Sequence, residues 1–442
     1  MVIAQEKFFG FIRRLMPRAV FKRLNPLYHK FLALLAVLIY RFPSRNIFVL
    51  GITGTKGKTS VAELVSAILE EAGFKTALIS TLRFKIGDDS ERNELKMTMP
   101  GRFFVQKFLR NAVEQHCRYA LLEITSQAVL QCRHKFIDLD AVVFTNLSPE
   151  HIEAHGSFEQ YKKSKLRILS ALENSSKKRK TIIVNADDEN AHSFADFKID
   201  ALWLYGLKKD NQSFFKDMPC KNLQGIAVSR YELKEDGIYF EIDKEPFFSP
   251  LLAEFNLYNI LAAVSFARSQ NIGWDVIRVA LQKFAGVSGR LEFIKEGQNF
   301  KVVVDYAHTP DSLQKVYELF KGKKICVLGS AGGGRDKWKR AEMGKISANY
   351  CGEIILTNED PYDENPAAII QDIAFGIEAP CKYKIIMDRR QAIQEAIGLA
   401  QPNDIVIITG KGAEPWIMGP NGSKIRWDDR EAAREALKKH YA

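Results

Sequence analysis

The sequence lacks the features of a secreted, membrane-spanning or disulfide-rich protein. Its six cysteines lie far apart and form no C-x-x-C pair, which argues against a zinc knuckle or a disulfide framework and favours a reducing cytoplasm. An apolar run at residues 31–40 would be about 15 Å long as a helix, whereas the core of a bilayer is roughly 30 Å thick. No small-residue cleavage site follows this run, so we do not expect a secretory signal.

Acidic residues are nearly absent from the first 45 residues. Nine Lys and Arg stand there against one acid, Glu6, so this arm carries most of the chain's formal net charge of +11. Apolar residues lie among these cations, and two interpretations stay open: an amphipathic helix on an anionic membrane surface, or a helical arm packed on the body. The rest of the chain shows no basic-aromatic module, so nucleic-acid binding is not expected.

Internal repeats and low-complexity tracts are also missing. With 442 residues, 46% of them hydrophobic and 26% charged, the chain has the composition of a soluble globular protein of two or three domains. From residue 46, strand-like runs alternate with helical patterns, which is typical of α/β proteins with a mostly parallel sheet covered by helices. The predicted strands are 76–80, 119–123, 141–145 and 181–184, and the predicted helices are 61–72, 102–115, 158–171, 259–269 and 274–283.

Two later regions complete the predicted organisation. Residues 207–250 are more polar and turn-rich, and we predict a hairpin-bearing insertion there. A second alternation starts at residue 301 and predicts a separate doubly wound, Rossmann-like domain. Its predicted strands are 301–305, 324–329, 353–357 and 404–408, and its predicted helices are 310–320, 341–350, 367–375, 390–399 and 430–439. The expected parts are therefore a basic amphipathic helical arm (1–45), a central domain (46–287) and a C-terminal domain (288–442).

The segment from Gly51 to Ser60 carries the most specific motif. An apolar run precedes it and an apolar-periodic stretch follows, so it reads as strand, glycine-rich loop and helix, although Ile52 replaces the first glycine of a strict G-x-x-x-x-G-K-[ST] pattern. Backbone N–H groups of such a loop bind phosphates, its lysine reaches the terminal phosphates, and a hydroxyl holds Mg²⁺. The predicted ATP-binding residues of this loop are Gly54, Thr55, Lys56, Gly57, Lys58, Thr59 and Ser60.

Further chemistry-bearing residues follow predicted strands downstream. Glu123 ends a strand, where its carboxylate can face the phosphate loop across the carboxyl edge of a parallel sheet and ligate Mg²⁺. The loop after the next strand contains His151 and His155, and Lys165 lies on the helix that follows. A single histidine is usually structural and a single lysine usually lies on a solvated helix face, but together these residues indicate a catalytic site.

Several motifs resemble the Mur ligases of peptidoglycan synthesis, and among them the ligases that add the third residue of the stem peptide. The motifs occur in the family's order from about residue 46 to residue 437. They are Thr53-Gly-Thr-Lys-Gly-Lys-Thr, Glu123-Ile-Thr-Ser, Thr145-Asn-Leu with His151 and His155-Gly, Tyr161-x-x-x-Lys165, Phe255–Ala263, Gly289-Arg-Leu-Glu, Asp305–Pro310 and Gly410-Lys-Gly. The resemblance implies an ATP-dependent acid–amino-acid ligase, in which a substrate carboxylate attacks the γ-phosphate and an amine attacks the resulting acyl phosphate.

The resemblance also implies roles for single residues. Lys58 and Thr59 are expected to hold the phosphates and one Mg²⁺, and Glu123 and His151 a second Mg²⁺. Lys165 matches a lysine that becomes a carbamate, which turns a cation that would oppose the metal into an anion that can ligate it. The catalytic residues are thus Lys58, Glu123, His151 and Lys165, and the metal ligands are Thr59, Glu123, His151 and Lys165. Further nucleotide contacts are expected from Asn256, Asn259, Arg290 and Asp305.

Two sets of residues are expected to bind the substrates. The resemblance assigns Thr98, Ser126 and Arg133 to the acceptor, and Arg335, Gly410 and Glu414 to the amino acid, with Arg335 on its α-carboxylate. Ligases for diaminopimelate carry an Asp-Asn-Pro-Arg segment, whereas this chain has Glu359, Asp360, Pro361 and Tyr362 at those positions. Two acids and a phenol without the guanidinium favour an amino acid with a side-chain ammonium, such as lysine, over diaminopimelate.

The acceptor stays open at this point. Relatives carry an N-terminal UDP-binding domain where this chain has 45 residues of basic arm, so the acceptor is either a UDP-linked or a lipid-linked muropeptide. We expect a cytoplasmic monomer, with peripheral contact at the inner face of the membrane through residues 1–45 as an alternative. A ligase of the same mechanism on another acceptor, such as a folylpoly-γ-glutamate synthetase, and a non-catalytic ATP-binding scaffold are the competing functions.

Overall fold

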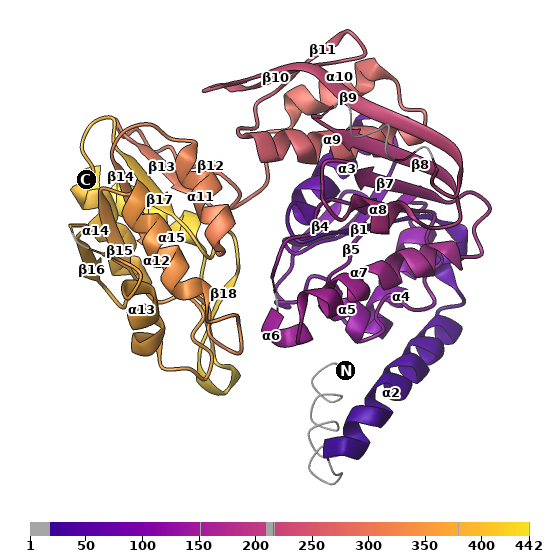
Figure 1. Ribbon diagram of the computed structural model, residues 1–442, viewed down its shortest axis with the longest axis horizontal. Helices are drawn as coiled ribbons and strands as arrows, with labels where there is room; N and C mark the ends of the chain where they lie inside the picture. Colours follow the sequence, from indigo (N-terminus) through magenta and orange to yellow (C-terminus); the bar gives the residue numbers. More distant parts are fainter. Residues whose placement is uncertain (1–17, 151, 209–214, 216, 379, 442) are drawn as a thin grey trace. The chain divides into compact units, whose positions relative to one another are not determined.

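The computed structural model describes residues 18–150, 152–208, 215, 217–378 and 380–441. The chain divides into two compact units (Figure 1). Unit 1 comprises Met1–Pro149 and Phe158–Ala285, and unit 2 comprises Glu150–Ser157 and Gly286–Ala442. The short segment with helix α6 (Ile152–His155) groups with unit 2 because Glu153 accepts a hydrogen bond from the Lys337 backbone N–H and its own N–H donates to Asp336, both at 3.0 Å.

Unit 1 is built on one sheet of eleven strands in the order β11-β10-β9-β8-β7-β6-β1-β5-β2-β3-β4. The strands from β9 to β2 pair in parallel, and a hairpin is added at each edge, β10–β11 and β3–β4. Their bounds are β1 Phe48–Thr53, β2 Thr76–Ile79, β3 Arg83–Ile86, β4 Asp89–Arg92, β5 Tyr119–Glu123, β6 Ala141–Phe144, β7 Thr181–Asn185, β8 Ile199–Gly206, β9 Cys220–Lys234, β10 Gly237–Ile242 and β11 Glu245–Ser249.

The mostly parallel sheet confirms the predicted fold class. The hairpin predicted within residues 207–250 is also present, but the region is not an insertion. Strand β9 pairs in parallel with β8, and β10 and β11 continue from it, so this region extends the central sheet. Strand β9 is exposed over residues 221–225 and 229–234, and it carries Arg230, Glu232 and Lys234 near its end. The polarity of these exposed stretches of β9 suggested an insertion.

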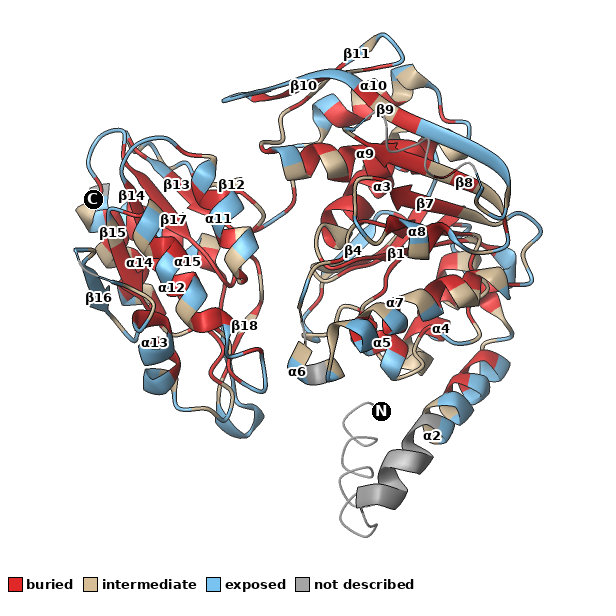
Figure 2. Cartoon of the chain, in the orientation of Figure 1, coloured by how far each residue is buried: buried red, intermediate tan, exposed pale blue. Residues whose placement is uncertain are grey.

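Two hydrophobic cores lie on the two faces of this sheet. Side chains of β1 alternate between them, with Val49 in one core and Leu50 and Ile52 in the other. Helices α4 (Arg102–Glu114), α5 (Ser126–Leu130), α7 (Phe158–Glu173) and α8 (Ala191–Ala195) contribute to the first core, and α3 (Lys58–Glu71), α9 (Glu254–Ser269) and α10 (Trp274–Lys283) to the second. The strands are therefore buried on both sides, as Figure 2 shows.

Helix α2 (Arg18–Ile39) packs on helix α4 of unit 1 through the small buried residues Ala33, Ala36 and Val37. After α2, the Arg110 guanidinium donates to the Tyr40 carbonyl at 2.7 Å, and the turn η1 (Pro43–Asn46) leads into β1. The part of the basic arm that the structure describes is thus a helix on the body, and residues 1–17 lie outside it. No helix within the described ranges combines the length and apolar character needed to cross a membrane.

Unit 2 contains a six-stranded sheet in the order β12-β13-β17-β14-β15-β16. All pairs are parallel except β12–β13, so the predicted doubly wound sheet is confirmed. Helices α14 and α15 pack on one core of this sheet. The elements are β12 Glu292–Phe293, β13 Lys301–Val304, α11 Pro310–Glu318, β14 Lys324–Leu328, α12 Lys339–Tyr350, β15 Glu353–Leu356, α13 Pro366–Ala374, β16 Tyr383–Ile385, α14 Arg389–Leu399, β17 Ile405–Ile408, β18 Trp416–Met418, η3 Pro420–Gly422, β19 Lys424–Arg426 and α15 Asp429–Tyr441.

One disulfide corrects the expectation drawn from cysteine spacing. Cys326 of β14 is bonded to Cys351, which ends α12 immediately before β15, with the two Cα atoms 6.1 Å apart. The two residues are 25 positions apart in the sequence, but β14 and β15 are neighbouring strands, so the fold brings them together. Spacing along the chain could not reveal this pair.

Candidate active site

The phosphate loop connects the end of β1 to the start of α3 and depends on two glycines. Gly54 and Gly57 have φ angles of 149° and 79°, a region that favours glycine. A Cβ atom on Gly54 would lie 1.9 Å from Thr145 Oγ1, and one on Gly57 would lie 2.2 Å from Asn259 Oδ1. The loop therefore takes this path only with glycine at both positions, and its backbone N–H groups stay close to the start of helix α3.

Residues after β6 hold this loop in place. The Thr55 N–H donates to the Asn146 carbonyl at 2.8 Å, and the Lys56 N–H donates to Asn146 Oδ1 at 2.9 Å. Thr145 Oγ1 donates to the Lys56 carbonyl at 2.7 Å. The sequence indicated the Thr-Asn segment as a motif but gave it no role, and the structure assigns it the support of the phosphate loop.

The two lysines predicted to be catalytic meet at the carbonyl oxygen of Gly54. Lys58 Nζ donates to this oxygen at 3.1 Å and to the Thr55 carbonyl at 2.8 Å. Lys165 Nζ, from helix α7, donates to the same oxygen at 2.6 Å, and its side chain is only 1% exposed. The ammonium also lies 4.7 Å from the ring centroid of Tyr161, whose hydroxyl is 3.1 Å from Thr55 Oγ1. The fold thus brings together two cations that are far apart in the sequence.

Glu123 lies beside the loop at the carboxyl end of β5, paired with Ile52 of β1. Its carboxylate is buried and accepts hydrogen bonds from Thr59 Oγ1 at 3.0 Å and from the Thr81 N–H at 2.9 Å. The Thr81 hydroxyl also donates to Glu123 at 3.1 Å and lies 2.9 Å from the hydroxyl of Thr98. Thr81 is a residue that sequence reasoning missed, because nothing near it in the chain marks it.

The donor set at this position fits Mg²⁺. Thr59 and Glu123 are hard oxygen donors 3.0 Å apart, and Mg²⁺ in phosphate-binding sites is held by one or two carboxylates together with substrate phosphates and water. Within the described ranges, no three His, Cys, Asp or Glu side chains gather in a metal-binding cluster. His151, predicted as a further ligand, lies outside the described residues.

The residues of unit 1 predicted to contact the nucleotide or the acceptor lie on elements next to the phosphate loop. Asn259 of α9 contacts Gly57 and donates to Asn256 Oδ1 at 3.0 Å. Ser126 is buried at the start of α5. Arg133 donates to Gln131 Oε1 at 2.7 Å and to the carbonyl of Met99, the residue after Thr98.

In unit 2, the predicted nucleotide residues Arg290 and Asp305 shape the turn after β13. The Asp305 carboxylate accepts backbone N–H groups of Leu291 at 2.8 Å and Ala307 at 2.7 Å. Burial raises the pKa of Asp305, and the nearby Arg290 opposes that shift. The Arg290 guanidinium stacks 3.9 Å from the ring centroid of Tyr306, and its Nη1 is buried without a hydrogen-bond partner.

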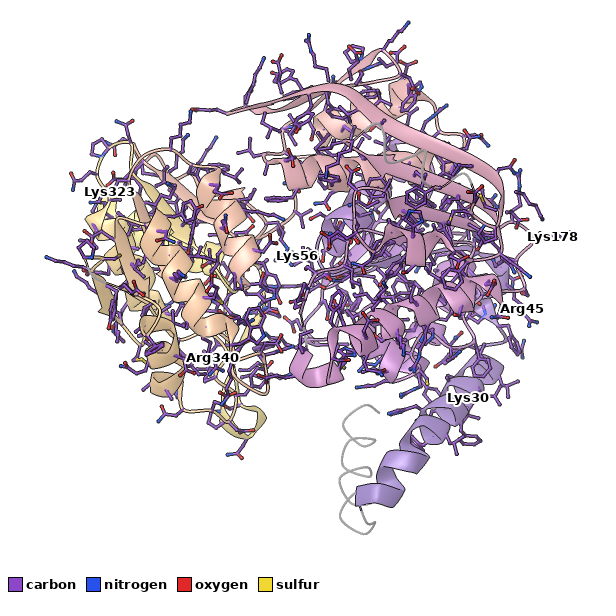
Figure 3. All side chains as sticks on the ribbon, viewed as in Figure 1. Lys30, Arg45, Lys56, Lys178, Lys323 and Arg340 are labelled. Carbon is purple, nitrogen blue, oxygen red and sulfur yellow. A yellow bond between two sulfur atoms is a disulfide. The ribbon has the colours of Figure 1, made fainter. Side chains whose placement is uncertain are left out.

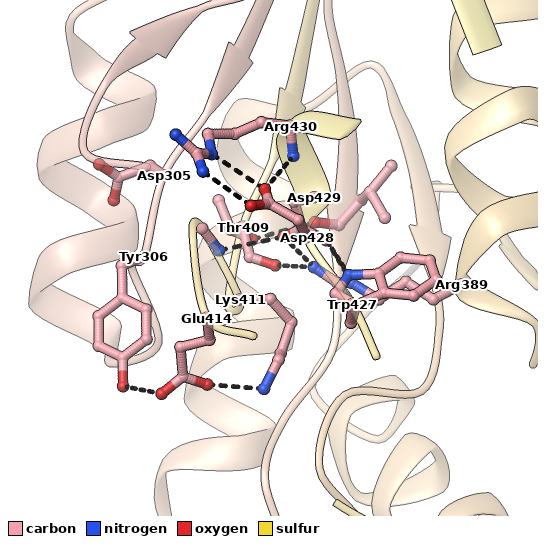
Figure 4. Close-up of polar contacts among 12 residues, drawn as sticks. Asp305, Tyr306, Arg389, Thr409, Lys411, Glu414, Trp427, Asp428, Asp429 and Arg430 are labelled. Carbon is pink, nitrogen blue, oxygen red and sulfur yellow. Dashed lines mark hydrogen bonds and ion pairs between the residues drawn. The ribbon is translucent and has the colours of Figure 1, made fainter. Parts of the chain in front are cut away.

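Of the carboxylates predicted to bind the amino-acid substrate, two are paired with a lysine and one has an unpaired oxygen. Lys411 is fully buried and donates to Asp360 at 2.8 Å and to Glu414 at 2.6 Å, while the Tyr306 hydroxyl donates to Glu414 at 3.0 Å (Figure 4). Glu359 is buried as well, but its Oε2 has no hydrogen-bond partner. Sequence reasoning missed Lys411, although it stands inside the Gly-Lys-Gly motif that marked this loop.

Further residues predicted to bind the amino-acid substrate surround this part of unit 2, and Gly410 lies close to Glu359. A Cβ on Gly410 would lie 2.4 Å from Glu359 Oε2, so glycine is required there. Burial raises the pKa of Glu359, and the cations Arg389 and Lys411 partly offset this shift. Burial lowers the pKa of Arg335, but its neighbours Tyr362 and Tyr306 raise it above its usual value. The guanidinium of Arg335 is therefore charged and lies against Tyr362.

A buried ion pair supports the loop that carries Gly410 and Glu414. Arg389 donates through Nε and Nη2 to the two carboxylate oxygens of Asp429, both at 2.8 Å, and its Nη2 donates to the Thr409 carbonyl at 2.6 Å (Figure 4). Asp429 also accepts the Trp427 indole N–H at 2.8 Å and the Gly412 N–H at 3.1 Å. The contacts to the Thr409 carbonyl and the Gly412 N–H fix the backbone on either side of Gly410.

A phosphate loop next to a hydroxyl–carboxylate pair, followed in the chain by a Rossmann-like unit, defines a nucleotide-dependent α/β enzyme. Family comparison goes further: residues 52–267 match the Mur ligase middle domain, and residues 289–412 match the Mur ligase, glutamate ligase domain. The chain belongs to the Mur ligase family. The predicted ATP-dependent ligase of peptidoglycan precursor synthesis is thereby confirmed, as is the use of ATP and Mg²⁺.

Individual relatives agree with this assignment. The chain is 37% identical over 413 residues to the UDP-N-acetylmuramoyl-L-alanyl-D-glutamate--2,6-diaminopimelate ligase of Syntrophomonas wolfei, covering 92% of this chain and 81% of the relative. The ligase of the same name from Oceanobacillus iheyensis is 35% identical over 418 residues, with the same coverage. A solved structure of a ligase of this name matches with 26% identity and a TM-score of 0.59, over 90% of this chain and 79% of that chain.

The fold is shared more widely. Folylpolyglutamate synthase of Mycobacterium tuberculosis, in complex with ADP, matches with a TM-score of 0.63 at 16% identity, over 85% of this chain and 90% of that chain. At this identity the likeness concerns the fold alone.

Proposed function

We propose that the chain forms an amide bond between an amino acid and the free carboxylate of a UDP-muramoyl-dipeptide, the acceptor in the relatives' names. The observation that carries this proposal is the convergence of Lys58 and Lys165 on Gly54, beside the oxygen pair of Thr59 and Glu123. Phosphoryl transfer from ATP to a carboxylate joins two anions, so repulsion between them dominates the barrier. Lys58, the loop N–H groups and bound Mg²⁺ would offset this repulsion, with Lys165 acting as a metal ligand once carbamylated.

The reaction has two steps. The acceptor carboxylate forms a bond to the γ-phosphorus while the bond to the β,γ-bridging oxygen breaks, and ADP leaves. The amine then bonds to the acyl carbon, the C–O bond to phosphate breaks, and the amine loses a proton. Lys58 and the loop N–H groups bind the phosphates, and Thr59 and Glu123 would hold Mg²⁺, which supplies further charge neutralisation when bound.

Lys165 is proposed to carry a carbamate that, with Glu123 and His151, holds a second Mg²⁺. Its position supports this, because Nζ is buried and 2.6 Å from an oxygen of the phosphate loop, where a second metal would otherwise meet a cation. Protein equilibrated with ¹³C-bicarbonate should show a carbamate carbonyl resonance by NMR, and the Lys165→Arg variant should lack it. A resonance of equal intensity in that variant would place the carbamate elsewhere and refute the assignment.

The amino acid is proposed to carry a side-chain amine and no second carboxylate. Glu359 supports this because its unpaired, buried Oε2 needs a hydrogen-bond donor, and an ammonium group supplies one. Asp360 is already paired with Lys411, so Glu359 and Tyr362 bear the selectivity, while Arg335 binds the α-carboxylate. The relatives' names specify diaminopimelate, whose second carboxylate would lie close to the Glu359 carboxylate.

The proposed function is tested by ADP release from the full chain with a matrix of substrates. Lysine, ornithine and diaminopimelate are each combined with the UDP-linked acceptor, a lipid-linked acceptor and dihydrofolate monoglutamate. We expect ADP only when both an amine and a muropeptide acceptor are present, and faster release with lysine or ornithine than with diaminopimelate. ADP formation that needs neither substrate would contradict the ligase activity. ADP formation with diaminopimelate, but not with lysine or ornithine, would contradict the proposed amino-acid selectivity.

Peripheral membrane contact through helix α2 is proposed on the basis of its outer face. Leu27, Phe31, Leu38 and Ile39 are more than half exposed, and Lys30, labelled in Figure 3, is an exposed cation of the same helix. An apolar face with flanking cations suits an anionic bilayer surface. Phe31→Ser with Leu38→Ser should weaken co-sedimentation with phosphatidylglycerol vesicles severalfold, whereas Phe375→Ser, at a residue of unit 2 that is 87% exposed, should not. Equal binding by all three proteins would remove α2 from any membrane contact.

A further inference from the structure

Three basic side chains of unit 1 gather where helix α2 meets the start of helix α4. Arg102, the first residue of α4, contacts His29 Nδ1 of α2 through Nη2 and also donates to the Gln131 carbonyl. Arg133 donates to the side chain of the same Gln131 at 2.7 Å. We call His29, Arg102 and Arg133 the basic cluster.

No carboxylate within the described residues pairs with the basic cluster. Apart from burial, the only described group that shifts the pKa of Arg133 is Arg102. The pKa of His29 is shifted by Arg102 and Arg133. Burial lowers the pKa of Arg133 to about 10 and that of His29 to about 4, and these neighbours add to both shifts. Among the described residues, the neighbours that oppose the lowering of the pKa of Arg102 are Cys132 and Tyr28, and neither is a carboxylate.

The basic cluster, whose arginines are partly buried, differs in this respect from the fully buried Arg340 and Arg389. Arg340 is 1% exposed and pairs with Glu364 at 3.0 Å and Asp372 at 2.9 Å, and Arg389 pairs with Asp429. Arg102 has no such carboxylate among the described residues, and its buried Nε, like that of Arg340, has no hydrogen-bond partner. Because a buried charge without a counter-charge is costly, the basic cluster is most stable with an anion bound to it.

The position of the basic cluster indicates which anion this is. Arg133 contacts Met97 and Met99, which flank Thr98, and the Thr98 hydroxyl reaches Glu123 through Thr81. The segment of residues 97–99 therefore runs from the phosphate-transfer site to the basic cluster. An acceptor whose carboxylate reacts near Glu123 extends along this segment, and its distal anionic group reaches the arginines.

We propose that His29 and Arg102, together with Arg133, bind the diphosphate group of the acceptor, so that helix α2 takes part in acceptor recognition. This inference rests on the proposed function. Guanidinium groups bind phosphate oxygens in a bidentate manner, and two of them match the charge of a diphosphate. UDP-linked and polyprenyl-linked acceptors both contain a diphosphate, so the basic cluster can bind the diphosphate of either acceptor.

The test uses Arg102→Ala and the control Lys107→Ala, which removes one exposed cation from the same helix. With the UDP-linked acceptor, Arg102→Ala should raise KM roughly tenfold, the effect of one lost charged hydrogen bond, with kcat within twofold. Lys107→Ala should leave both parameters unchanged. Removing the diphosphate from the acceptor should raise the wild-type KM by a similar factor, and Arg102→Ala should then add little. The same measurements with a polyprenyl-diphosphate acceptor in micelles show which of the two acceptors the enzyme uses.

Equal KM increases for the diphosphate and phosphate-free acceptors in Arg102→Ala would overturn the proposal, as would an unchanged KM. Arg102→Lys should recover part of the loss, and His29→Gln provides a second variant that leaves the first turn of α4 intact. Calorimetric titration of the UDP-linked acceptor without ATP separates this proposal from the proposed function. If the wild type forms no ADP with any substrate, the ligase fails, but weaker binding by Arg102→Ala than by Lys107→Ala still supports the site, and equal binding refutes it.

Discussion

Replacement of Lys58 by alanine should lower ADP formation about 10²–10³-fold, because one preorganised cation at a developing charge contributes that much to the rate. Lys58 lies across the phosphate loop, with Nζ within 3.1 Å of the Gly54 and Thr55 carbonyls. The fold should not change, since Lys58 is only partly buried at the first position of α3. Initial rates of ADP release at saturating substrates, together with the melting temperature, measure this effect.

The control for this variant is Lys75→Ala, at an exposed lysine of unit 1 that has no place in the site. It should leave the rate within twofold of the wild type. A Lys58→Ala protein that melts at the wild-type temperature and keeps its full rate would show that the phosphate loop has no part in catalysis, and the proposed function would fall with it.

Replacement of Asp429 by alanine should lower the free energy of unfolding of unit 2 by about 3–5 kcal/mol, the usual effect of removing one partner of a buried ion pair. Arg389 is 1% exposed and would keep its charge without a counter-ion, and the Trp427 and Gly412 N–H groups would lose their acceptor. Urea unfolding followed by tryptophan fluorescence measures the change, because Trp427 lies at the pair.

The matched control is Asp311→Ala, which breaks a salt bridge between two half-exposed side chains, Asp311 and Lys315, on helix α11 of the same unit. Its effect should stay below about 1 kcal/mol, as for other surface pairs. If the two variants lose equal stability, the pair of Arg389 and Asp429 is no more important than a surface contact. Arg389→Met combined with Asp429→Leu should recover part of the loss, because it leaves no unpaired buried charge.

The elements that the sequence predicted best are those whose signal is local. The phosphate loop, Glu123 at the end of β5 and the central strands of both units follow from short apolar runs and turn residues, and their ends agree with the structure within a few residues. Short strands such as β3, β4, β12 and β16 were not predicted. Strand β8 was missed, and β9 was misread because its long exposed stretches carry polar side chains and lack the continuous apolar pattern of buried strands.

Contacts between distant residues could not be predicted in this way. Thr81 acquires its role from Glu123, 42 positions further along the chain, and Lys411 from Asp360, 51 positions before it. The Cys326–Cys351 disulfide and the basic cluster likewise depend on which strands and helices become neighbours. In each case the residue type is ordinary, and only its partner gives it a function.

The tight approach of Gly57 to Asn259, and of Gly410 to Glu359, links positions that are remote in the chain. Neither glycine can acquire a side chain unless its partner becomes smaller, and backbone angles of 79° and 106° resist the change even then. A substitution at either glycine therefore requires a compensating substitution at its partner. These four positions should vary less during evolution than the residues of surface loops.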